Sequence, residues 1–309
     1  MPYRQYKARQ RRVERKLQAA SAILPAMAMK PRITLVGAGN LGSALGVSLR
    51  QAGYQIDAVV ARARGRSLRK AQSLAKEISS RAVSTRRARI ESEVVWLCVP
   101  DSQIARVAES LVTNLLWKGR VALHSSGALT SDELSALRRC GAAVASVHPL
   151  MTFVRGSRPA LAGVPFAIEG DAVAVRVARR MVADLGGTPF TIRKRDKAAY
   201  HAWGTFASPL LTALLAATER VAAAAGVHAK AARKRMFPIL QQTIANYVGL
   251  GAADSFSGPI VRGDVETVRC HLRVLEEIPP AREAYVALAR AALLYLPAKN
   301  RRLLGEVLK

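Results

Sequence analysis

Cysteine, aromatic residues and acidic residues are all scarce in this 309-residue chain. The three cysteines, Cys98, Cys140 and Cys270, lie far apart, and none stands in a Cys-x-x-Cys pair or at a zinc-binding spacing from histidine. A disulfide scaffold and a metal site are therefore not expected, and a reducing cytoplasm fits the unpaired thiols. No run approaches the roughly 18 apolar residues of a membrane-spanning helix, so we expect no membrane partner.

Asp and Glu total 21 against 48 Lys and Arg, which gives a formal net charge of +27 at pH 7. Such a charge is typical of proteins that bind nucleic acid. Here the arginines are spread along the chain, aromatics make up only 5%, and no nucleic-acid-binding motif is present. We interpret the charge as a solvated surface that attracts small anionic substrates, and we expect no nucleic-acid partner.

The first 29 residues carry a basic run followed by a short apolar piece that Pro25 interrupts. A signal peptide has a shorter basic start and a continuous apolar middle. We therefore expect residues 1–29 to be a disordered basic leader, or the native start to be Met27 or Met29.

The strongest motif is the run Ile33-Thr-Leu-Val-Gly-Ala-Gly-Asn-Leu-Gly42, in which an apolar segment ends in G-x-G-x-x-G and leads into a helical pattern. A strand, a glycine turn and a helix in this order bind the pyrophosphate of a dinucleotide, and the helix N-terminus attracts the phosphates. A glycine turn without a ligand is the alternative. We expect cofactor contacts from Gly37, Gly39, Asn40, Leu41 and Gly42.

The segment that follows the second predicted strand, residues 54–60, indicates which dinucleotide binds. NAD sites carry Asp or Glu about 20 residues beyond the glycines, where it binds the ribose 2′-hydroxyl. Here the chain reads Ala61-Arg-Ala-Arg64 and offers no carboxylate. Because guanidinium groups suit a 2′-phosphate, we predict NADP, bound by Arg62 and Arg64. The alternative is that these arginines belong to the generally basic surface.

Further apolar runs alternate with helical segments, at residues 93–99, 121–124, 142–147, 166–170 and 189–192. Continuous apolar runs are typical of parallel strands that are covered on both faces. Beyond about Arg193 the chain is rich in Ala and Leu at helical spacing. We predict an α/β Rossmann domain with a mostly parallel, doubly wound sheet over residues 30–193. An all-α substrate and dimerisation domain follows over residues 194–309, with the active site in the cleft between them.

Several predicted strands end in residues that suit a ligand site, at the sheet edge where α/β proteins bind ligands. Val99-Pro100 should border the cofactor. Ser125-Ser126 are expected to donate hydrogen bonds to nicotinamide or substrate, because no G-x-S-x-G elbow surrounds them. His124 and His148 could each bond a substrate carbonyl or merely cap a strand. We favour His148 for catalysis and assign His124 to substrate binding.

Two pairs of residues in the second predicted domain are candidates for chemistry. Lys197 and His201 stand four apart on one helix face, and either could act as general acid or base. The alternative is a surface lysine beside a core-facing histidine. Arg262 could hold a substrate carboxylate while Asp264 caps the next helix, or the two form a structural ion pair.

Four stretches together resemble the Rossmann-like family that carries a C-terminal domain of unknown function 2520. They are His124-Ser-Ser-Gly-Ala-Leu129, Ser146-Val-His-Pro-Leu-Met-Thr-Phe153, Lys197-Ala-Ala-Tyr-His201 and Gly258-Pro-Ile-Val-Arg-Gly-Asp264. The family is similar in plan to pyrroline-5-carboxylate reductases, deazaflavin-dependent NADP oxidoreductases and β-hydroxyacid dehydrogenases. The resemblance implies an NADP-type dehydrogenase, a homodimer packed through the second domain and, as in hydroxyacid dehydrogenases, a catalytic lysine. Ser208-Pro209 stands where the family has Ser-Asn, so a contact from that Asn is missing.

Two functions compete on this evidence. The first is an NADP-dependent oxidoreductase acting on a small anionic carbonyl, imine or hydroxy acid, with Lys197 or His201 as proton donor and Arg262 as anion clamp. It requires these three residues to converge near the nicotinamide. The second is a non-catalytic NADP-binding sensor, and nucleic-acid binding is the weakest alternative.

Overall fold

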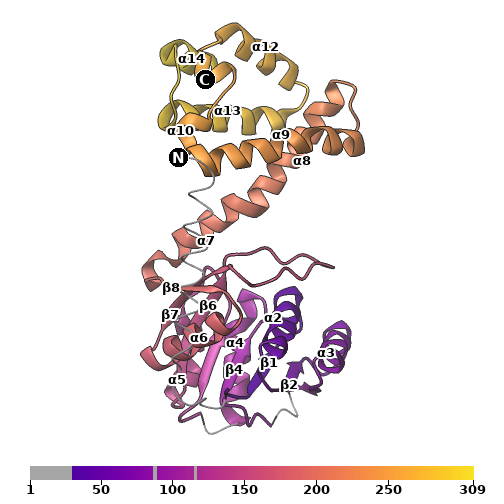
Figure 1. Ribbon diagram of the computed structural model, residues 1–309, viewed down its shortest axis with the longest axis vertical. Helices are drawn as coiled ribbons and strands as arrows, with labels where there is room; N and C mark the ends of the chain where they lie inside the picture. Colours follow the sequence, from indigo (N-terminus) through magenta and orange to yellow (C-terminus); the bar gives the residue numbers. More distant parts are fainter. Residues whose placement is uncertain (1–29, 86–88, 115–116) are drawn as a thin grey trace, which may run out of the picture. The chain divides into compact units, whose positions relative to one another are not determined.

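The computed structural model describes residues 30–85, 89–114 and 117–309, so the predicted leader lies outside the described residues. The chain forms two compact units, one ending at Ala202 and the other running from Trp203 to Lys309. Figure 1 draws the first unit in indigo to pink and the second in orange to yellow. The division falls nine residues beyond the boundary expected from the sequence, so Lys197 and His201 belong to the first unit.

An eight-stranded sheet forms the centre of the first unit, in the order β3-β2-β1-β4-β5-β6-β7-β8. Its neighbours pair in parallel except β6 and β7, which pair antiparallel. This confirms the predicted mostly parallel Rossmann sheet. The strands are β1 (Ile33–Val36), β2 (Ile56–Ala61), β3 (Arg81–Ser84), β4 (Val94–Leu97), β5 (Val121–His124), β6 (Ala143–Pro149), β7 (Pro165–Gly170) and β8 (Thr188–Thr191).

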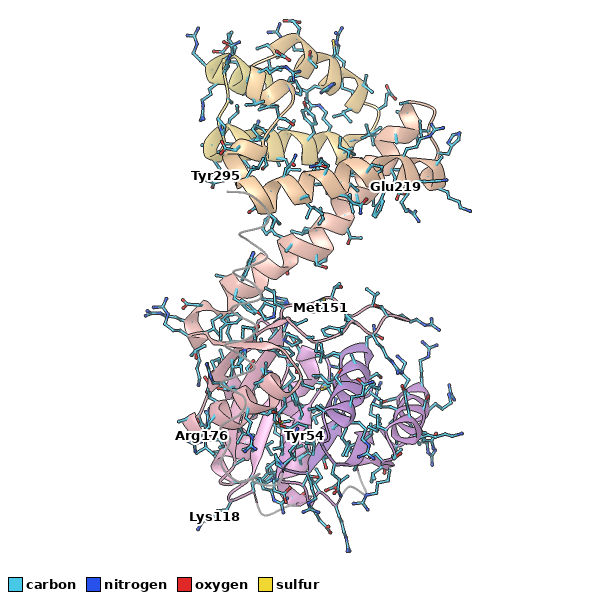
Figure 2. All side chains as sticks on the ribbon, viewed as in Figure 1. Tyr54, Lys118, Met151, Arg176, Glu219 and Tyr295 are labelled. Atoms are coloured by element: carbon cyan, nitrogen blue, oxygen red, sulfur yellow. The ribbon has the colours of Figure 1, made fainter. Side chains whose placement is uncertain are left out.

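Helices cover both faces of this sheet, because successive strand residues point to opposite sides. In β4, Trp96 joins an apolar cluster with α2, α3 and α6, whereas Val95 joins a cluster with α4 and α5. Tyr54, labelled in Figure 2, is fully buried and donates to Asp184 at 2.8 Å. The helices are α2 (Asn40–Gln51), α3 (Arg66–Glu77), α4 (Ile104–Leu111), α5 (Ser135–Arg139) and α6 (Ala172–Asp184), with 3₁₀ turns η2 (Asp101–Gln103), η3 (Val112–Asn114), η4 (Ser131–Leu134) and η5 (Lys194–Asp196).

The second unit is helical, as the Ala/Leu-rich pattern predicts. Helix α7 (Lys197–Thr205) crosses the division and continues into a π-helical turn, η6 (Phe206–Leu210), that contains Pro209. A small apolar cluster joins α12, α13 and α14 around Val268, Ala289 and Leu304. The remaining helices are α8 (Leu211–Ala224), α9 (Ala229–Leu250), α10 (Ala252–Ser255), α11 (Pro259–Arg262), α12 (Val265–Leu275), α13 (Pro279–Tyr295) and α14 (Arg301–Val307).

Within the described parts of the chain, no helix is by itself long and apolar enough to cross a bilayer. Only the pair Lys194–Ala224 and Ala229–Leu250, bent by 115° at its break, meets the length and composition requirements together.

Candidate active site

A cleft of about 680 Å³ lies at the carboxyl ends of β1, β2 and β4. Gly37 and Gly39 border it from the turn between β1 and α2, and Val99 and Pro100 border it after β4. Arg62, directly after β2, lines the same cleft. The structure therefore brings five of the predicted cofactor residues together at the edge where α/β sheets bind ligands.

The glycines of this turn have different physical reasons to be glycine. Gly37 has φ +105°, and a Cβ there would lie 2.4 Å from the carbonyl oxygen of Cys98. A Cβ on Gly42 would lie 2.2 Å from the carbonyl oxygen of Gly37, so both positions are fixed by packing within the protein. At Gly39, φ is an ordinary −71° and no atom lies within 4 Å of a Cβ. Open space beside this residue, at the N-terminus of α2, fits a pyrophosphate that approaches the backbone.

Among the described residues that line the cleft, the charged ones are all cationic, namely Arg62, Arg66, Lys70 and Arg106, and none is Asp or Glu. Sequence reasoning missed three of them. Arg66 and Lys70 stand four apart at the start of α3, a spacing that places them on one helix face and could have revealed them. This concentration of positive charge fits a ligand that carries several phosphates.

Arg64 lines a different pocket, together with Leu68, Gln72 and residues of β3. The expected pairing of Arg62 with Arg64 is therefore not found at the cleft. Asn40 and Leu41 also do not line it. The Asn40 amide donates to the carbonyl oxygen of Phe153 at 3.1 Å, and Leu41 packs partly against the apolar cluster beneath α2. The cofactor contacts expected from these two residues stay a prediction.

The side chains of Ser125 and Ser126 are engaged with the protein. The Ser125 hydroxyl accepts a hydrogen bond from Trp96 Nε1 at 2.8 Å. The Ser126 hydroxyl donates to Asp101 at 2.8 Å and accepts from the Leu129 N–H at 2.9 Å. Both residues are buried, so the expected bonds from these hydroxyls to a nicotinamide or substrate receive no support.

His124 is fully buried, and both of its ring nitrogens have partners. Nε2 lies 3.0 Å from the carbonyl oxygen of Thr130, and Nδ1 accepts from the Ser126 N–H at 3.1 Å. Burial lowers the pKa of His124 to about 4, so the ring is neutral at pH 7. Neither nitrogen remains for a substrate, and the strand-capping alternative describes this residue.

The second part of the site surrounds Gly127, where residues from three elements meet. His148, at the end of β6, has Nδ1 2.9 Å from the hydroxyl of Tyr200, and the two rings are nearly perpendicular. The His201 ring lies 6.0 Å from that of His148 between centroids. A Cβ on Gly127 would lie 2.5 Å from His201 Cδ2 and 2.8 Å from His148 Nε2. The lack of a side chain at Gly127 thus makes room for both histidines.

The protonation states of these groups follow from their surroundings. Burial, with a smaller contribution from Lys197, lowers the pKa of His148 to about 3, so its imidazole is neutral at pH 7. Burial raises the pKa of Tyr200 to about 12, which keeps its hydroxyl protonated. Tyr200 was missed in the sequence analysis, although its spacing of three from Lys197 places both on one helix face.

Lys197 is fully buried, whereas His201 is exposed, which reverses the alternative of a surface lysine beside a core-facing histidine. The Lys197 ammonium donates to the carbonyl oxygen of Ser126 at 2.9 Å and to the hydroxyl of Ser146 at 2.6 Å. Burial lowers the pKa of Lys197 to about 8, and the negative charges of Glu169 and Asp101 oppose that shift.

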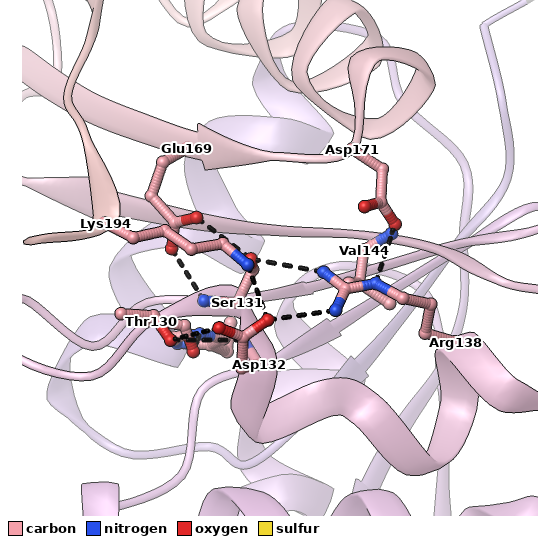
Figure 3. Close-up of polar contacts among 9 residues, drawn as sticks. Thr130, Ser131, Asp132, Arg138, Val144, Glu169, Asp171 and Lys194 are labelled. Carbon is pink, nitrogen blue, oxygen red and sulfur yellow. Dashed lines mark hydrogen bonds and ion pairs between the residues drawn. The ribbon is translucent and has the colours of Figure 1, made fainter.

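A polar network next to this cluster fixes the loop after β5 (Figure 3). The buried Glu169 carboxylate accepts from the backbone N–H of Ser131 at 2.6 Å and from its hydroxyl at 2.9 Å. Arg138 pairs with both Asp132 and Asp171, at 2.9 and 3.1 Å. Sequence reasoning missed this network, because its members are far apart in the chain and meet only when β5, β6 and β7 pair.

Arg262 and Asp264 lie in the helical unit and form an ion pair, with 2.7 Å between Arg262 Nη2 and the carboxylate. Asp264 stands at the N-cap position of α12, but its side chain makes no capping hydrogen bond, so that expectation is wrong. The mutual ion pair is the alternative that the structure contains. The convergence of Arg262 with Lys197 and His201 stays a prediction.

Comparisons with known proteins agree with this architecture. Residues 18–149 match the Rossmann-like domain, and residues 164–292 match the domain of unknown function 2520. No curated protein matches the chain.

Three solved structures illustrate the shared fold. A Bacteroides fragilis protein proposed to be an NADP oxidoreductase is 18% identical with a TM-score of 0.73, over 85% of this chain and 97% of that one. A Thermotoga maritima protein is 25% identical with a TM-score of 0.65, over 89% and 98%. An imine reductase from Myxococcus stipitatus in complex with NADP⁺ is 18% identical with a TM-score of 0.64, over 90% and 100%. The chain therefore consists of a Rossmann-like domain followed by a domain of unknown function 2520.

Proposed function

We propose that this protein is an NADP-dependent oxidoreductase that transfers hydride to or from a small anionic carbonyl, imine or hydroxy acid. The observation that carries the proposal is the cleft at Gly39, which combines open space at the helix N-terminus with a lining whose described residues include four cationic side chains and no carboxylate. Structural similarity to an imine reductase in complex with NADP⁺ and to a pyrroline-5-carboxylate reductase from Coxiella burnetii supports the same reaction class.

The cofactor would be held by the two ends of the cleft. The backbone at Gly39 and the start of α2 would bind the pyrophosphate, and Arg62 with Arg66 and Lys70 would bind the 2′-phosphate. Bound NADPH would supply the hydride. In the described part of the chain no acidic residue lines the cleft, so a charged 2′-phosphate would be attracted by each charged side chain of that lining.

The protein would contribute a hydrogen-bond donor that activates the substrate. If the Tyr200 hydroxyl donates to His148 Nδ1, the ring proton stands on Nε2, the ring nitrogen that lies against Gly127. A neutral imidazole can donate that proton in a hydrogen bond to a carbonyl oxygen and polarise the bond that accepts hydride. His201 lies against the same glycine and is the second candidate proton donor.

Titration of the purified protein with NADPH and NADH tests the proposal. NADPH should bind more tightly than NADH, and Arg62→Ala should weaken NADPH binding about 10- to 100-fold while leaving NADH binding nearly unchanged, because one charge-assisted contact is lost. Arg64→Ala is the matched control: it removes the same charge two residues away, at a pocket outside the cleft. Equal losses from both variants would assign the effect to general surface charge. Binding of neither nucleotide would refute the oxidoreductase.

Activity is then tested by following NADPH absorbance with small keto acids and cyclic imines. Turnover that depends on His148 supports the enzyme. Tight NADPH binding without turnover across such a panel favours the non-catalytic sensor.

A homodimer through the helical unit is part of the proposal. None of the described residues of α8 is buried, and the 22-residue helix α9 buries only Ala232. Exposed apolar side chains on the unit include Ile239, Val248 and Tyr295, at 68, 78 and 81% (Tyr295 is labelled in Figure 2). An exposed apolar surface of this extent favours binding to a protein partner. A second copy of the chain carries the same surface, so a two-fold dimer would bury it on both subunits.

Sedimentation equilibrium tests this assembly. The wild-type protein should have twice the 33.3 kDa chain mass, and Val248→Asp should shift it toward the monomer. Val173→Asp, which places the same charge on an exposed valine of α6, is the control and should not change the mass. A monomeric wild-type protein would refute the dimer.

A further inference from the structure

We propose that Lys197 is a positioning residue that fastens the Ser126–Gly127 turn to β6 and α7, and does not itself contact substrate. The inference rests on the proposed function, because it assigns a role at the same site. It differs from the expectation that Lys197 serves as a proton donor.

The first observation is a closed set of hydrogen bonds inside the protein. Lys197 Nζ donates to the Ser126 carbonyl oxygen and to the Ser146 hydroxyl, and that hydroxyl lies 3.1 Å from the same carbonyl oxygen. Ser146 can therefore accept from Lys197 while it donates to Ser126. The three residues come from β6, the start of α7 and the loop after β5, so one ammonium joins three segments.

The second observation is that Ser126 is held at every polar group. Its N–H donates to His124, its hydroxyl donates to Asp101, and its carbonyl oxygen accepts from Lys197. The residue that follows is Gly127, the contact point of His148 and His201. A shift of Ser126 therefore moves the surface against which both histidine rings are placed.

The third observation is that the same helix carries the partner of His148. Tyr200 lies three residues after Lys197, on the same face of α7, and its hydroxyl contacts His148 Nδ1. Fixing the first turn of α7 at Lys197 thereby fixes the hydroxyl that contacts His148 Nδ1, and the direction of that hydrogen bond selects the tautomer of His148. The exposed fraction of Lys197 is 0%, and its ammonium is hydrogen-bonded within the protein. Such a buried and satisfied charge fits a structural connection better than a proton donor that must reach solvent and substrate.

Chemical labelling of the wild-type protein tests the burial directly. In reductive methylation with formaldehyde and cyanoborohydride, Lys197 should react at least about tenfold more slowly than Lys194, because a buried amine reacts only through local opening. Lys194 is the internal control, since it lies three residues earlier and its side chain is 42% exposed. Equal labelling of the two lysines would overturn the inference.

Variants test the positioning role through the imidazole of His148, observed by ¹H–¹⁵N NMR. Lys197→Met and Ser146→Ala should both shift the His148 ring signals. Ser146 is not a candidate proton donor to a substrate, so a shift caused by Ser146→Ala would come from the hydrogen-bond network that Ser146 shares with Lys197. The double variant should be little worse than Lys197→Met, because both changes break one network. Lys194→Met should leave the signals unchanged.

Unshifted His148 signals in both variants would overturn the positioning role, even if Lys197→Met abolished turnover. If Lys197→Met fails to fold, Ser146→Ala and the labelling of the wild-type protein still decide the question. NADPH titration of the wild-type protein separates this outcome from failure of the proposed function, since that titration does not depend on Lys197.

Discussion

One methyl group added at Gly127 tests the candidate active site most directly. Gly127 does not have a positive φ, so alanine suits its backbone. Its Cβ would lie 2.5 Å from His201 Cδ2 and 2.8 Å from His148 Nε2. Comfortable contacts between such atoms are about 3.5 Å or longer, so one or both rings must move by roughly 1 Å.

The two rings will not yield equally. His201 is exposed, whereas His148 is half-buried and has Nδ1 within hydrogen-bond distance of the Tyr200 hydroxyl. Overpacking of this kind costs about 1–3 kcal/mol, and we expect the lower half of that range because the His201 ring lies at the surface. Turnover should fall by at least about tenfold, since displacement of a catalytic group by 1 Å can cost a factor of 100. NADPH affinity should change little, because Gly127 does not line the cleft.

Urea unfolding, NADPH titration and NADPH-dependent turnover measure these three quantities for Gly127→Ala. The double variant Gly127→Ala/His201→Ala should recover part of the lost stability, because it removes the closest overlap. If Gly127→Ala is as stable and as active as the wild-type protein, with unmoved ring signals for His148, the packing argument for this site is refuted.

Three further predictions concern the cofactor and the buried ionisable groups. Gly39→Ala should leave urea stability within about 0.5 kcal/mol, since its Cβ meets open space, but should weaken NADPH binding in a fluorescence titration by at least about tenfold; undiminished binding would remove the phosphate from this position. The pKa values of His124 and His148 are lowered to about 4 and about 3, so the unfolded chain takes up protons first below pH 6.5, and urea stability should fall by about 2 kcal/mol per histidine between pH 7 and pH 5. His148→Gln should remove its own share of that fall, and an unchanged pH dependence in this variant would contradict a buried neutral ring. The pKa of Lys197 is about 8 in the folded protein, against 10.5 for an ordinary lysine. Between pH 8 and pH 10.5 the free energy of unfolding of the wild-type protein should therefore rise by at most about 3 kcal/mol relative to that of Lys197→Met, measured by urea unfolding. A parallel pH dependence of the two proteins would contradict this.

The sheet and the glycine turn could be predicted from the sequence because each depends on local pattern. A continuous apolar run such as residues 94–97 suits a strand covered on both faces, wherever that strand lies in the sheet. Gly37 and Gly39 sit between a strand and a helix, and the turn needs only that local context. The parallel order of the sheet followed from the alternation of strands and helices.

The polar residues at the strand ends could not be assigned in the same way. Ser125, Ser126 and His124 have the chemistry of a ligand site, but the side chain of each forms hydrogen bonds within the protein, to partners that the sequence does not reveal. Arg62 and Arg64 differ by two positions in a turn, and only the folded chain decides that one faces the cleft.

Helix α7 gives the clearest case of this limit. The spacing of Lys197 and His201 correctly implied one helix, but the side on which the protein packs cannot be read from two polar residues. The lysine is buried and the histidine exposed because Ser126 and Ser146 lie against the first turn of the helix. Those partners come from β6 and from the loop after β5, so their position is a property of the sheet.

The contrast between Gly39 and Gly127 explains why the two ends of the site differ in this respect. Gly39 leaves open space at the N-terminus of α2, and the phosphate proposed to bind there would be held by backbone N–H groups, so this part of the site depends on a local motif. Gly127 leaves space for side chains of the protein itself, which arrive from β6 and α7. Since substrate chemistry depends on converging side chains, whereas phosphate binding depends on one turn of backbone, the proposed phosphate site could be predicted from the sequence and the proposed reacting site requires the fold.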